Sequence, residues 1–255
     1  PIFNAKEAAV VDGIEVYPAR NLREVIGILE GDNSTPLKVS WEEFVKAADS
    51  QVDFAEVRGQ FFAKRALEVA AAGFHNVLMV GPPGSGKTML AKRFPTILPS
   101  MSQAEMFETT KIYSVLGYLS GRKAFITTRP FREVHHTASN IALVGGGVSV
   151  RPGEISLAHN GVLFLDEMPE FKRDVLEALR QPLEEGKVTI ARASSTHSFP
   201  SRVLLIGAMN PCPCGYYGSS TKICRCSLAQ IQKYRRKISG PLLDRMDIHL
   251  SLIHI

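Results

Sequence analysis

Residues 81–88 combine residue types that bind phosphate groups. They are Gly81, Pro82, Pro83, Gly84, Ser85, Gly86, Lys87 and Thr88, after an apolar run at 77–80 and before a helical segment at 89–94. Glycines let successive backbone N–H groups point at phosphate oxygens, and the start of a helix adds positive partial charge. Lys87 would reach the β- and γ-phosphates, and the Thr88 hydroxyl would bind Mg²⁺. A turn alone explains the glycines but not Lys-Thr directly after them, so the segment predicts nucleotide binding.

Two carboxylates end a second apolar run. Residues 161–165 contain no polar side chain and are followed by Asp166 and Glu167. Such a run is typical of a strand buried on both faces of a parallel sheet, whose carboxyl end opens on the ligand crevice. Asp166 would hold Mg²⁺ there, directly or through water, and Glu167 would polarise the attacking water. Acidic residues commonly end strands, but together with the phosphate-binding segment the pair predicts a site for nucleotide hydrolysis.

A third apolar run at 202–208 precedes Asn210. An amide at the end of that strand can reach the γ-phosphate and the attacking water. The alternative is that Asn210 only caps a turn before Pro211.

All four cysteines lie in one short window, as Cys212, Cys214, Cys224 and Cys226. Two C-x-C pairs can wrap a tetrahedral thiolate site for Zn²⁺, although this spacing is less diagnostic than C-x-x-C. Free thiols are the main alternative in a reducing compartment, and disulfides are the third. The clustering favours structural zinc.

A sheet with surrounding helices must position these groups. Strands are predicted at 77–80, 161–165, 187–191 and 202–208, and helices at 60–72 and 173–181. Gly73 is expected as the C′ residue of the first helix, and residues 194–196 as a hairpin tip. Three glycines at 145–147 predict a flexible tip or a hairpin turn. The pattern indicates an α/β protein whose parallel sheet is flanked by helices and carries β-hairpin insertions.

The first part of the chain differs from the rest. Residues 13–18 alternate like a strand, 21–29 have helical spacing, 31–36 form a turn-rich linker, and 41–48 resemble a short helix. The nucleotide-binding domain is expected to begin at Asp53. Because the chain lacks an initiator Met and ends in an uncapped apolar segment, we expect a piece of a longer protein.

Composition restricts the location and the partners. No apolar run approaches the length of a membrane span, and the start lacks the layout of a signal peptide, so we expect a cytoplasmic protein without a membrane partner. Residues 1–58 hold six Lys/Arg and eleven Asp/Glu, a net −5, which leaves 24 minus 14, or +10, for the rest. This surplus favours an anionic partner such as DNA; an ordinary solvated surface is the alternative.

Two further segments bear on binding. Basic residues at 122, 123, 129 and 132 would suit a loop that touches nucleic-acid phosphates, or an ordinary surface loop. The adjacent His135 and His136 would point to opposite faces of an extended chain, which argues against a shared metal. Residues 219–243 hold six Lys/Arg and no acid, which fits either a DNA-binding face or a solvated one.

The motifs jointly resemble the AAA+ ATPases of the magnesium-chelatase-like group, and most closely the YifB/ComM family of bacteria. The resemblance rests on residues 81–88, 143–159, 161–171, 209–215 and 239–247 and covers nearly the whole chain. It implies that residues 1–30 end a Lon-protease-like domain, that 31–52 are a linker, and that 53–255 form an AAA+ core without its lid. Residues 143–159 and 187–203 would be insertions facing the central pore of a ring.

The same resemblance implies roles for two residues. Asn210 would be the sensor-1 residue and Arg245 the arginine finger. An arginine between a buried helix and a strand could reach a neighbouring subunit's γ-phosphate, which agrees with the second role. An internal ion pair with Asp244 or Asp247 is the alternative. Val134 departs from the family, which often has proline before the two histidines.

The resemblance implies an ATP-binding, Mg²⁺-dependent ATPase that works as a homo-oligomeric ring, expected to be a hexamer. The expected task is DNA branch migration in recombination or natural transformation. The alternative is a chelatase-type remodeller that drives metal insertion through a partner subunit. Proteolysis is not expected, because no Ser/Lys catalytic pair can be placed in residues 1–30.

Overall fold

The computed structural model describes residues 1–11, 13–31, 35–39, 52–119, 125–147, 149–191, 196–220 and 222–253. The chain divides into two compact units, Pro1–Asp49 with Ser102–Thr128, and Ser50–Met101 with Arg129–Ile255. The larger unit contains every residue that the sequence assigns to the nucleotide site and all four cysteines. Within the described ranges no helix combines the length and the apolarity needed to cross a membrane.

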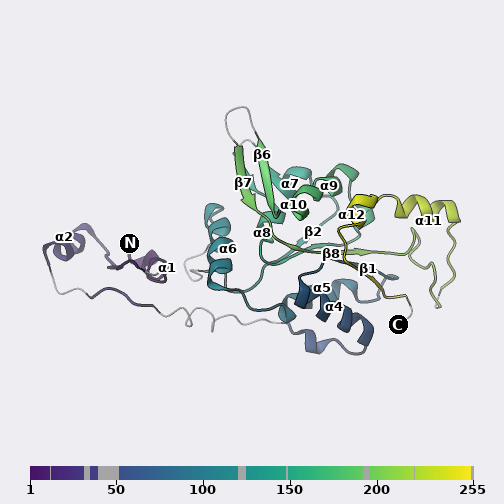
Figure 1. Cartoon of the computed structure of the whole chain (residues 1–255), viewed down its shortest axis with the longest axis horizontal. Coiled ribbons are helices and arrows are strands. Elements are labelled where there is room, and N and C mark those ends of the chain that lie inside the picture. The colour runs from purple at the N-terminus through teal and green to yellow at the C-terminus, as the bar shows by residue number, and fades with distance from the viewer. Residues whose placement is uncertain are drawn as a thin grey trace. The chain divides into compact units, whose positions relative to one another are not determined.

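A five-stranded sheet forms the centre of the larger unit (Figure 1). Its strands lie in the order β2 (Phe131–Val134), β5 (Val162–Leu165), β8 (Leu204–Met209), β1 (Val77–Val80) and β9 (Ile248–Ser251). All neighbouring pairs are parallel. The strands predicted at 77–80, 161–165 and 202–208 are confirmed as β1, β5 and β8, with ends that differ by at most two residues.

Side chains of the central strands alternate between two hydrophobic cores. In β5, Leu163 and Leu165 belong to one core and Val162 and Phe164 to the other, and all four are fully buried. The first core includes residues of α7 (Asn140–Val144), α8 (Glu154–Leu157), α9 (Arg173–Glu177) and α12 (Gly240–Leu243). The second includes residues of α4 (Phe61–Gly73) and α5 (Lys87–Arg93). Helices therefore cover both faces, as an unbroken apolar strand requires.

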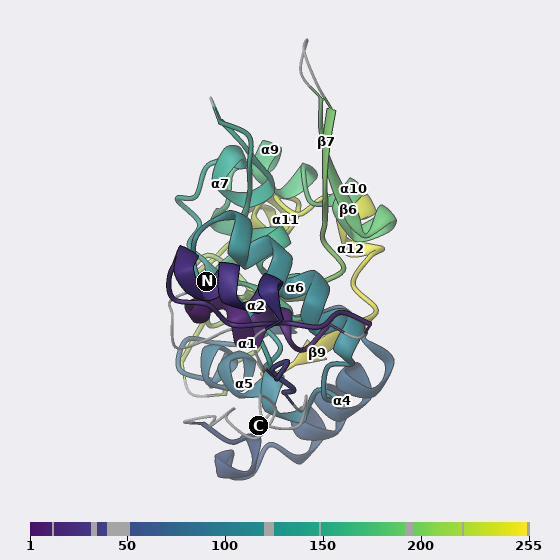
Figure 2. The same ribbon diagram turned by 90° about the vertical axis from the view of Figure 1, so that its left-hand side faces the viewer.

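Two antiparallel hairpins are added to this core. One pairs β3 (Gly145–Gly146) with β4 (Arg151–Pro152), and the other pairs β6 (Lys187–Ala191) with β7 (Thr196–Pro200). Both views show the β6–β7 hairpin leading away from the helices of the larger unit (Figures 1 and 2). The two hairpins are confirmed, while their facing the pore of a ring stays a prediction. Thr196 belongs to β7, and residues 194 and 195 of the predicted tip lie outside the described residues.

The remaining helices and 3₁₀ turns are divided between the two units. The helices are α1 (Ala5–Ala8), α2 (Leu22–Glu30), α6 (Gln103–Val115), α10 (Arg180–Glu185) and α11 (Leu228–Arg235), and the 3₁₀ turns are η1 (Ile2–Asn4), η2 (Phe54–Glu56), η3 (Phe94–Ile97) and η4 (Met168–Glu170). Helix α2 confirms the helix predicted at 21–29, with Asn21 as its N-cap. The helix predicted at 41–48 lies outside the described residues.

Three local predictions are wrong. The helix predicted at 173–181 is divided into α9 and α10, because Pro182 has no N–H to donate to the carbonyl of Ala178. Residues 13–18 form no strand, because alternation alone does not supply a pairing partner. Gly73 is the last helical residue of α4, and Phe74 adopts the left-handed C-cap conformation instead, with φ 56°.

Gly161 is placed where the chain passes close to Pro130 just before β5. A Cβ at this position would lie 2.1 Å from the Pro130 carbonyl oxygen, which accepts a 2.8 Å hydrogen bond from the Val162 N–H. Gly161→Ala is therefore expected to lower the free energy of unfolding by about 1–3 kcal/mol, as overpacking does. Urea denaturation of both proteins measures this difference.

Gly240→Ala is the matched control, because nothing lies within 4 Å of a Cβ added at the start of α12. We expect that variant to remain close to the parent chain. Equal stabilities for the two variants would contradict the close approach of Gly161 to Pro130.

Candidate nucleotide-binding site

The phosphate loop connects β1 to α5 at the carboxyl end of the central strand. Gly84 and Gly86 have φ of 81° and 86°, a left-handed conformation that side chains other than glycine rarely adopt. At the start of the loop, the Gly81 N–H donates to the Met209 carbonyl at 3.1 Å, which ties the loop to the end of β8. The loop therefore needs glycine at positions 84 and 86, as the phosphate-loop pattern in the sequence predicts.

Lys87 is the charged centre of the loop and is only 9% exposed. Its ammonium donates to the carbonyls of Gly81 and Pro82 at 2.7 and 2.9 Å and lies 3.3 Å from Asn210 Oδ1. Burial lowers the pKa of Lys87, and the nearby charges of Asp166 and Glu167 oppose that shift. A cation thus lies over the loop where an anionic phosphate group would be its natural partner.

Thr88 and Asp166 meet across the edge of the sheet. The Thr88 hydroxyl donates to Asp166 Oδ2 at 2.7 Å, and Asp166 Oδ1 accepts from the Glu167 N–H at 2.9 Å. Hydroxyl and carboxylate oxygens are the hard ligands that Mg²⁺ prefers. The two side chains therefore fit the magnesium site predicted from the sequence.

Glu167 has an unusual backbone conformation, with φ 51° and ψ 43°. Left-handed residues other than glycine cost free energy and concentrate at functional sites. Glu167 Oε2 lies 3.5 Å from His136 Nδ1. Together with Asp166, these residues line a surface hollow of about 440 Å³ beside the end of β2.

Two residues near the site were missed by the sequence reasoning. Gln60 donates from Nε2 to the Ser85 carbonyl at 3.0 Å, while its buried Oε1 has no hydrogen-bond partner among the described residues. His136 contacts Glu167, and its ring centroid lies 4.1 Å from that of His135. The prediction that the histidines point to opposite faces is wrong, because β2 ends at Val134 and the chain turns at 136–137. No signal in the sequence marks either contact.

Arg245 lies outside this group of contacts. It follows α12 and precedes β9, as predicted, and its guanidinium lies 2.9 Å from Glu184 Oε2 on α10. The side chain is 39% exposed. The alternative of an internal ion pair is thus realised, but with Glu184 and not with Asp244 or Asp247.

The basic residues in and just before β2 have internal contacts in the parts that the structure describes. Arg132 forms a two-pronged pair with Glu154, at 2.6 and 2.9 Å. Arg129 donates to the carbonyls of Pro99 and Asn160 at 2.6 and 2.7 Å. These two arginines support the fold, which favours the ordinary-surface interpretation for them; residues 122 and 123 lie outside the described residues.

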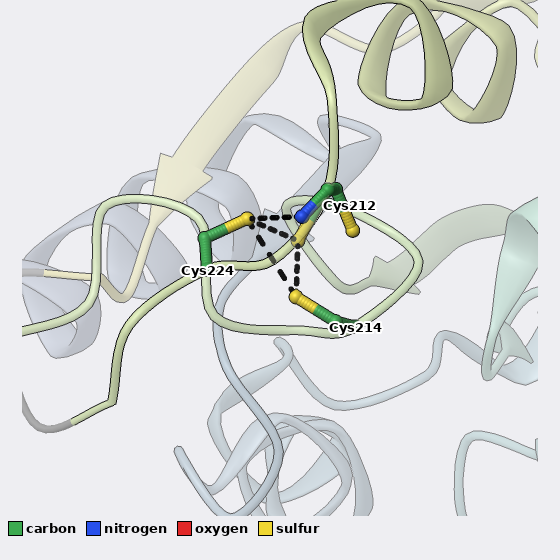
Figure 3. Close-up of side chains that lie close together, drawn as sticks. Cys212, Cys214 and Cys224 are labelled. Carbon is green, nitrogen blue, oxygen red and sulfur yellow. Dashed lines mark hydrogen bonds between the residues drawn. The ribbon is translucent and has the colours of Figure 1, made fainter.

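The four cysteines converge on the loop between β8 and α11. The Sγ atom of Cys212 lies 3.3 Å from that of Cys214 and 3.7 Å from that of Cys224 (Figure 3). With Cys226 included, the four sulfurs lie within 4.8 Å of one another. None of the four is part of a disulfide.

Sheet order, phosphate loop and acidic pair together define the larger unit as a P-loop fold of the AAA+ type. A family model described as magnesium chelatase, subunit ChlI, matches residues 53–255, and the chain belongs to this family.

Three relatives illustrate the similarity. The chain is 46% identical over 259 residues to competence protein ComM of Haemophilus influenzae, which covers 98% of this chain and 49% of that protein. It is 43% identical over 249 residues to the uncharacterized protein YifB of Escherichia coli, covering 98% and 48%. It is 25% identical over 181 residues to a protein of Oryza sativa named "Probable DNA helicase MCM9", covering 71% and 22%. The chain thus spans about half the length of ComM and YifB, and the resemblance to the YifB/ComM family is confirmed.

Lys87→Ala is expected to weaken binding of a fluorescent ATP analogue by about a hundred-fold or more, because each charged hydrogen bond to phosphate contributes about 1.5–3 kcal/mol. Fluorescence titration with Mg²⁺ measures the effect. The control is Lys92→Ala on the same helix, whose ammonium pairs with Glu133 at the surface, 2.9 Å away. Parent-like affinity in a folded Lys87→Ala protein would contradict the role of this lysine.

Proposed function

We propose that residues 53–255 bind ATP with Mg²⁺ and hydrolyse it as the motor module of a ring-shaped assembly. One observation carries the proposal: Lys87 contacts Asn210 and Thr88 contacts Asp166, so segments that follow three separate strands meet at one edge of the sheet. Membership of the magnesium chelatase ChlI family supports the same assignment.

Each residue has a role that its position supports. The loop N–H groups and Lys87 bind the phosphates, with the ammonium moving from the loop carbonyls to the more strongly charged ligand. Thr88 and Asp166 hold Mg²⁺, which would neutralise phosphate charge when bound. Glu167 accepts a hydrogen bond from the attacking water and orients it. Asn210 donates from its amide group to the γ-phosphate or to that water.

Arg245 acts between subunits in this proposal. Its exposed guanidinium, held by Glu184 in the single chain, would exchange that pair for the γ-phosphate of a neighbouring subunit. A surface ion pair of this kind contributes roughly 0–1 kcal/mol, so the exchange costs little. The ring is expected to be a hexamer, as the family resemblance implies.

Glu167→Gln tests the hydrolytic role. The amide is similar in shape but is a much weaker base, so we expect parent-like ATP binding and turnover reduced by about 10²–10⁴-fold. A coupled ATPase assay and the fluorescence titration give the two readings. Glu170→Gln is the control, because Glu170 lies in the adjacent turn and pairs with Lys237, 3.0 Å away. Undiminished turnover in Glu167→Gln would exclude Glu167 as the residue that orients the water.

The partner that we propose for the ring is DNA, in branch migration during recombination or transformation. Six basic side chains on the cysteine loop (residues 210–227) and around α11 are exposed: Lys222, Arg225, Lys233, Arg235, Arg236 and Lys237. The β6–β7 hairpin extends from the same unit. The names of two relatives support this partner, one being a competence protein and the other a probable DNA helicase.

A DNA partner predicts that forked DNA stimulates ATPase activity at low salt. We expect the double substitution Lys233→Glu/Arg236→Glu to weaken DNA binding. The decrease of log affinity with log salt should also become less steep, by about 1 for each DNA phosphate that the variant no longer binds. Lys64→Glu/Arg65→Glu on α4 introduces the same charge change elsewhere and serves as the control. If forked DNA neither stimulates the ATPase activity of the unsubstituted full-length protein nor binds to it at low salt, DNA is excluded as the partner.

The alternative is a remodeller that drives metal insertion through a partner subunit. The family model, named for a magnesium chelatase subunit, favours it. A remodeller predicts ATPase stimulation by a protein partner and indifference to DNA, so the same assay separates the two.

We propose that residues 1–30 belong to a Lon-protease-like domain. Helix α2 contains no buried residue and exposes Leu22 and Leu29 by 73% and 81%. Exposed apolar residues along one helix are expected where further parts of a domain would cover them. We place the linker at residues 31–52.

A further inference from the structure

The loop between β8 and α11 lacks the usual means of holding a fixed shape. It runs from Asn210 to Ser227, and its described residues form neither helix nor strand. Among them only Pro211, Cys212 and Gly215 are buried. Long loops without secondary structure or a core of their own are uncommon in compact domains unless something else orders them.

This loop nevertheless makes close contacts with the nucleotide site. A Cβ on Gly215 would lie 2.7 Å from Pro83 Cδ of the phosphate loop and 3.9 Å from Asn210 Cγ. Gly215 has φ 86°, so both the backbone conformation and the space exclude a larger residue. Asn210, at the start of the same loop, lies 3.3 Å from the Lys87 ammonium. The shape of the cysteine loop therefore decides how Asn210 and the phosphate loop meet.

The sulfur geometry matches one particular crosslink. Zinc–sulfur bonds of about 2.3 Å place tetrahedral sulfurs about 3.8 Å apart. The Sγ separations of 3.3, 3.7 and 3.6 Å among Cys212, Cys214 and Cys224 are close to this value. A disulfide would instead require about 2.05 Å. Four free thiols in such proximity are suited to a metal ion.

Backbone N–H groups point at two of the sulfurs. The Tyr217 N–H donates to Cys212 Sγ at 3.3 Å, and the Cys226 N–H donates to Cys224 Sγ at 3.4 Å. A zinc ion with four thiolates carries a net double negative charge. Lys222 and Arg225 line a hollow of about 470 Å³ together with Cys214 and supply opposite charge.

We infer that Cys212, Cys214, Cys224 and Cys226 bind one structural Zn²⁺ ion, which fixes the loop that holds Asn210 and Gly215 against the phosphate loop. The metal thus acts by keeping Asn210 in position, and the cysteines take no part in the chemistry. The zinc site stands on the sulfur geometry alone, whereas its effect on ATP turnover rests on the proposed function.

Metal analysis of the full chain, purified without metal-affinity resin, tests the site. We expect about one zinc ion per chain. Cobalt(II) added to the zinc-stripped chain is expected to give the absorption of a tetrahedral thiolate complex. Absence of stoichiometric zinc together with failure to bind cobalt would overturn the site, and this reading involves no substitution that might fail to fold.

Substitution identifies the ligands. Cys214→Ser/Cys226→Ser is expected to lose the metal, because two of four ligands are removed. Ile223→Ser is the matched control in the same loop, since Ile223 is 90% exposed and lies next to Cys224. Stoichiometric zinc in the double cysteine variant would overturn the assignment.

Hydrogen–deuterium exchange of the zinc-loaded and zinc-stripped chain tests the positioning role without nucleotide. We expect zinc removal to speed exchange in residues 211–220 and also in the phosphate loop, while α4 stays unchanged. Adding zinc back should restore protection. Unchanged exchange at 81–86, with faster exchange confined to the cysteine loop, would overturn the link between metal and phosphate loop.

ATP turnover gives the functional reading. We expect zinc removal to reduce turnover by about ten-fold or more, because a small displacement of a positioned group is costly to catalysis, and zinc addition to restore it. Undiminished turnover after zinc removal would overturn the effect on catalysis. Failure of the chain to bind ATP, with or without zinc, would instead overturn the proposed function. Metal analysis would still show whether the zinc site exists.

Discussion

The parallel pairing of β1, β5 and β8 is the constraint on which the site depends. Val80 pairs with Met209, and Leu165 pairs with Gly207, so all three strands end at one edge of the sheet. The phosphate loop, Asp166 and Asn210 leave the strands from that edge. A slip of one residue would exchange the faces of every side chain in a strand. The packing of alternate side chains into the two cores therefore also fixes the register of the polar residues beyond them.

The polar edge is balanced around a buried cation. Removing the Lys87 ammonium from water costs free energy, which carbonyls of Gly81 and Pro82 offset by hydrogen bonding. Neutral carbonyls are weaker partners than an anion, and the lowered pKa of Lys87 reflects the burial that remains uncompensated. The strained backbone of Glu167 adds a second local cost. Both costs fall at the candidate site and not in the hydrophobic cores. Proteins retain such local costs at sites that bind a ligand.

Sequence predicted what depends on local pattern. Apolar runs located β1, β5 and β8, and the Gly-rich segment located the phosphate loop, because both signals lie within a few residues. The pairing of Arg245 with Glu184 and the contact of His136 with Glu167 join distant segments, so no local pattern contains them. The break between α9 and α10 was readable from Pro182, whose effect on a helix is local. The alternation at 13–18 misled because a strand needs a partner that alternation does not provide.

All four cysteines lie outside the two hydrophobic cores or at their margin, in one loop. Free cysteine packs well as a small apolar residue and is among the most buried residue types, so the two cores could have accommodated it. Instead all four lie in the loop after β8, where few of the described residues are buried and none of them belongs to a strand. That loop begins at Asn210 and ends at Ser227, the N-cap of α11. It therefore joins the polar edge of the sheet to the basic helix, a connection for which hydrophobic packing supplies little rigidity and a sulfur-bound metal would supply much.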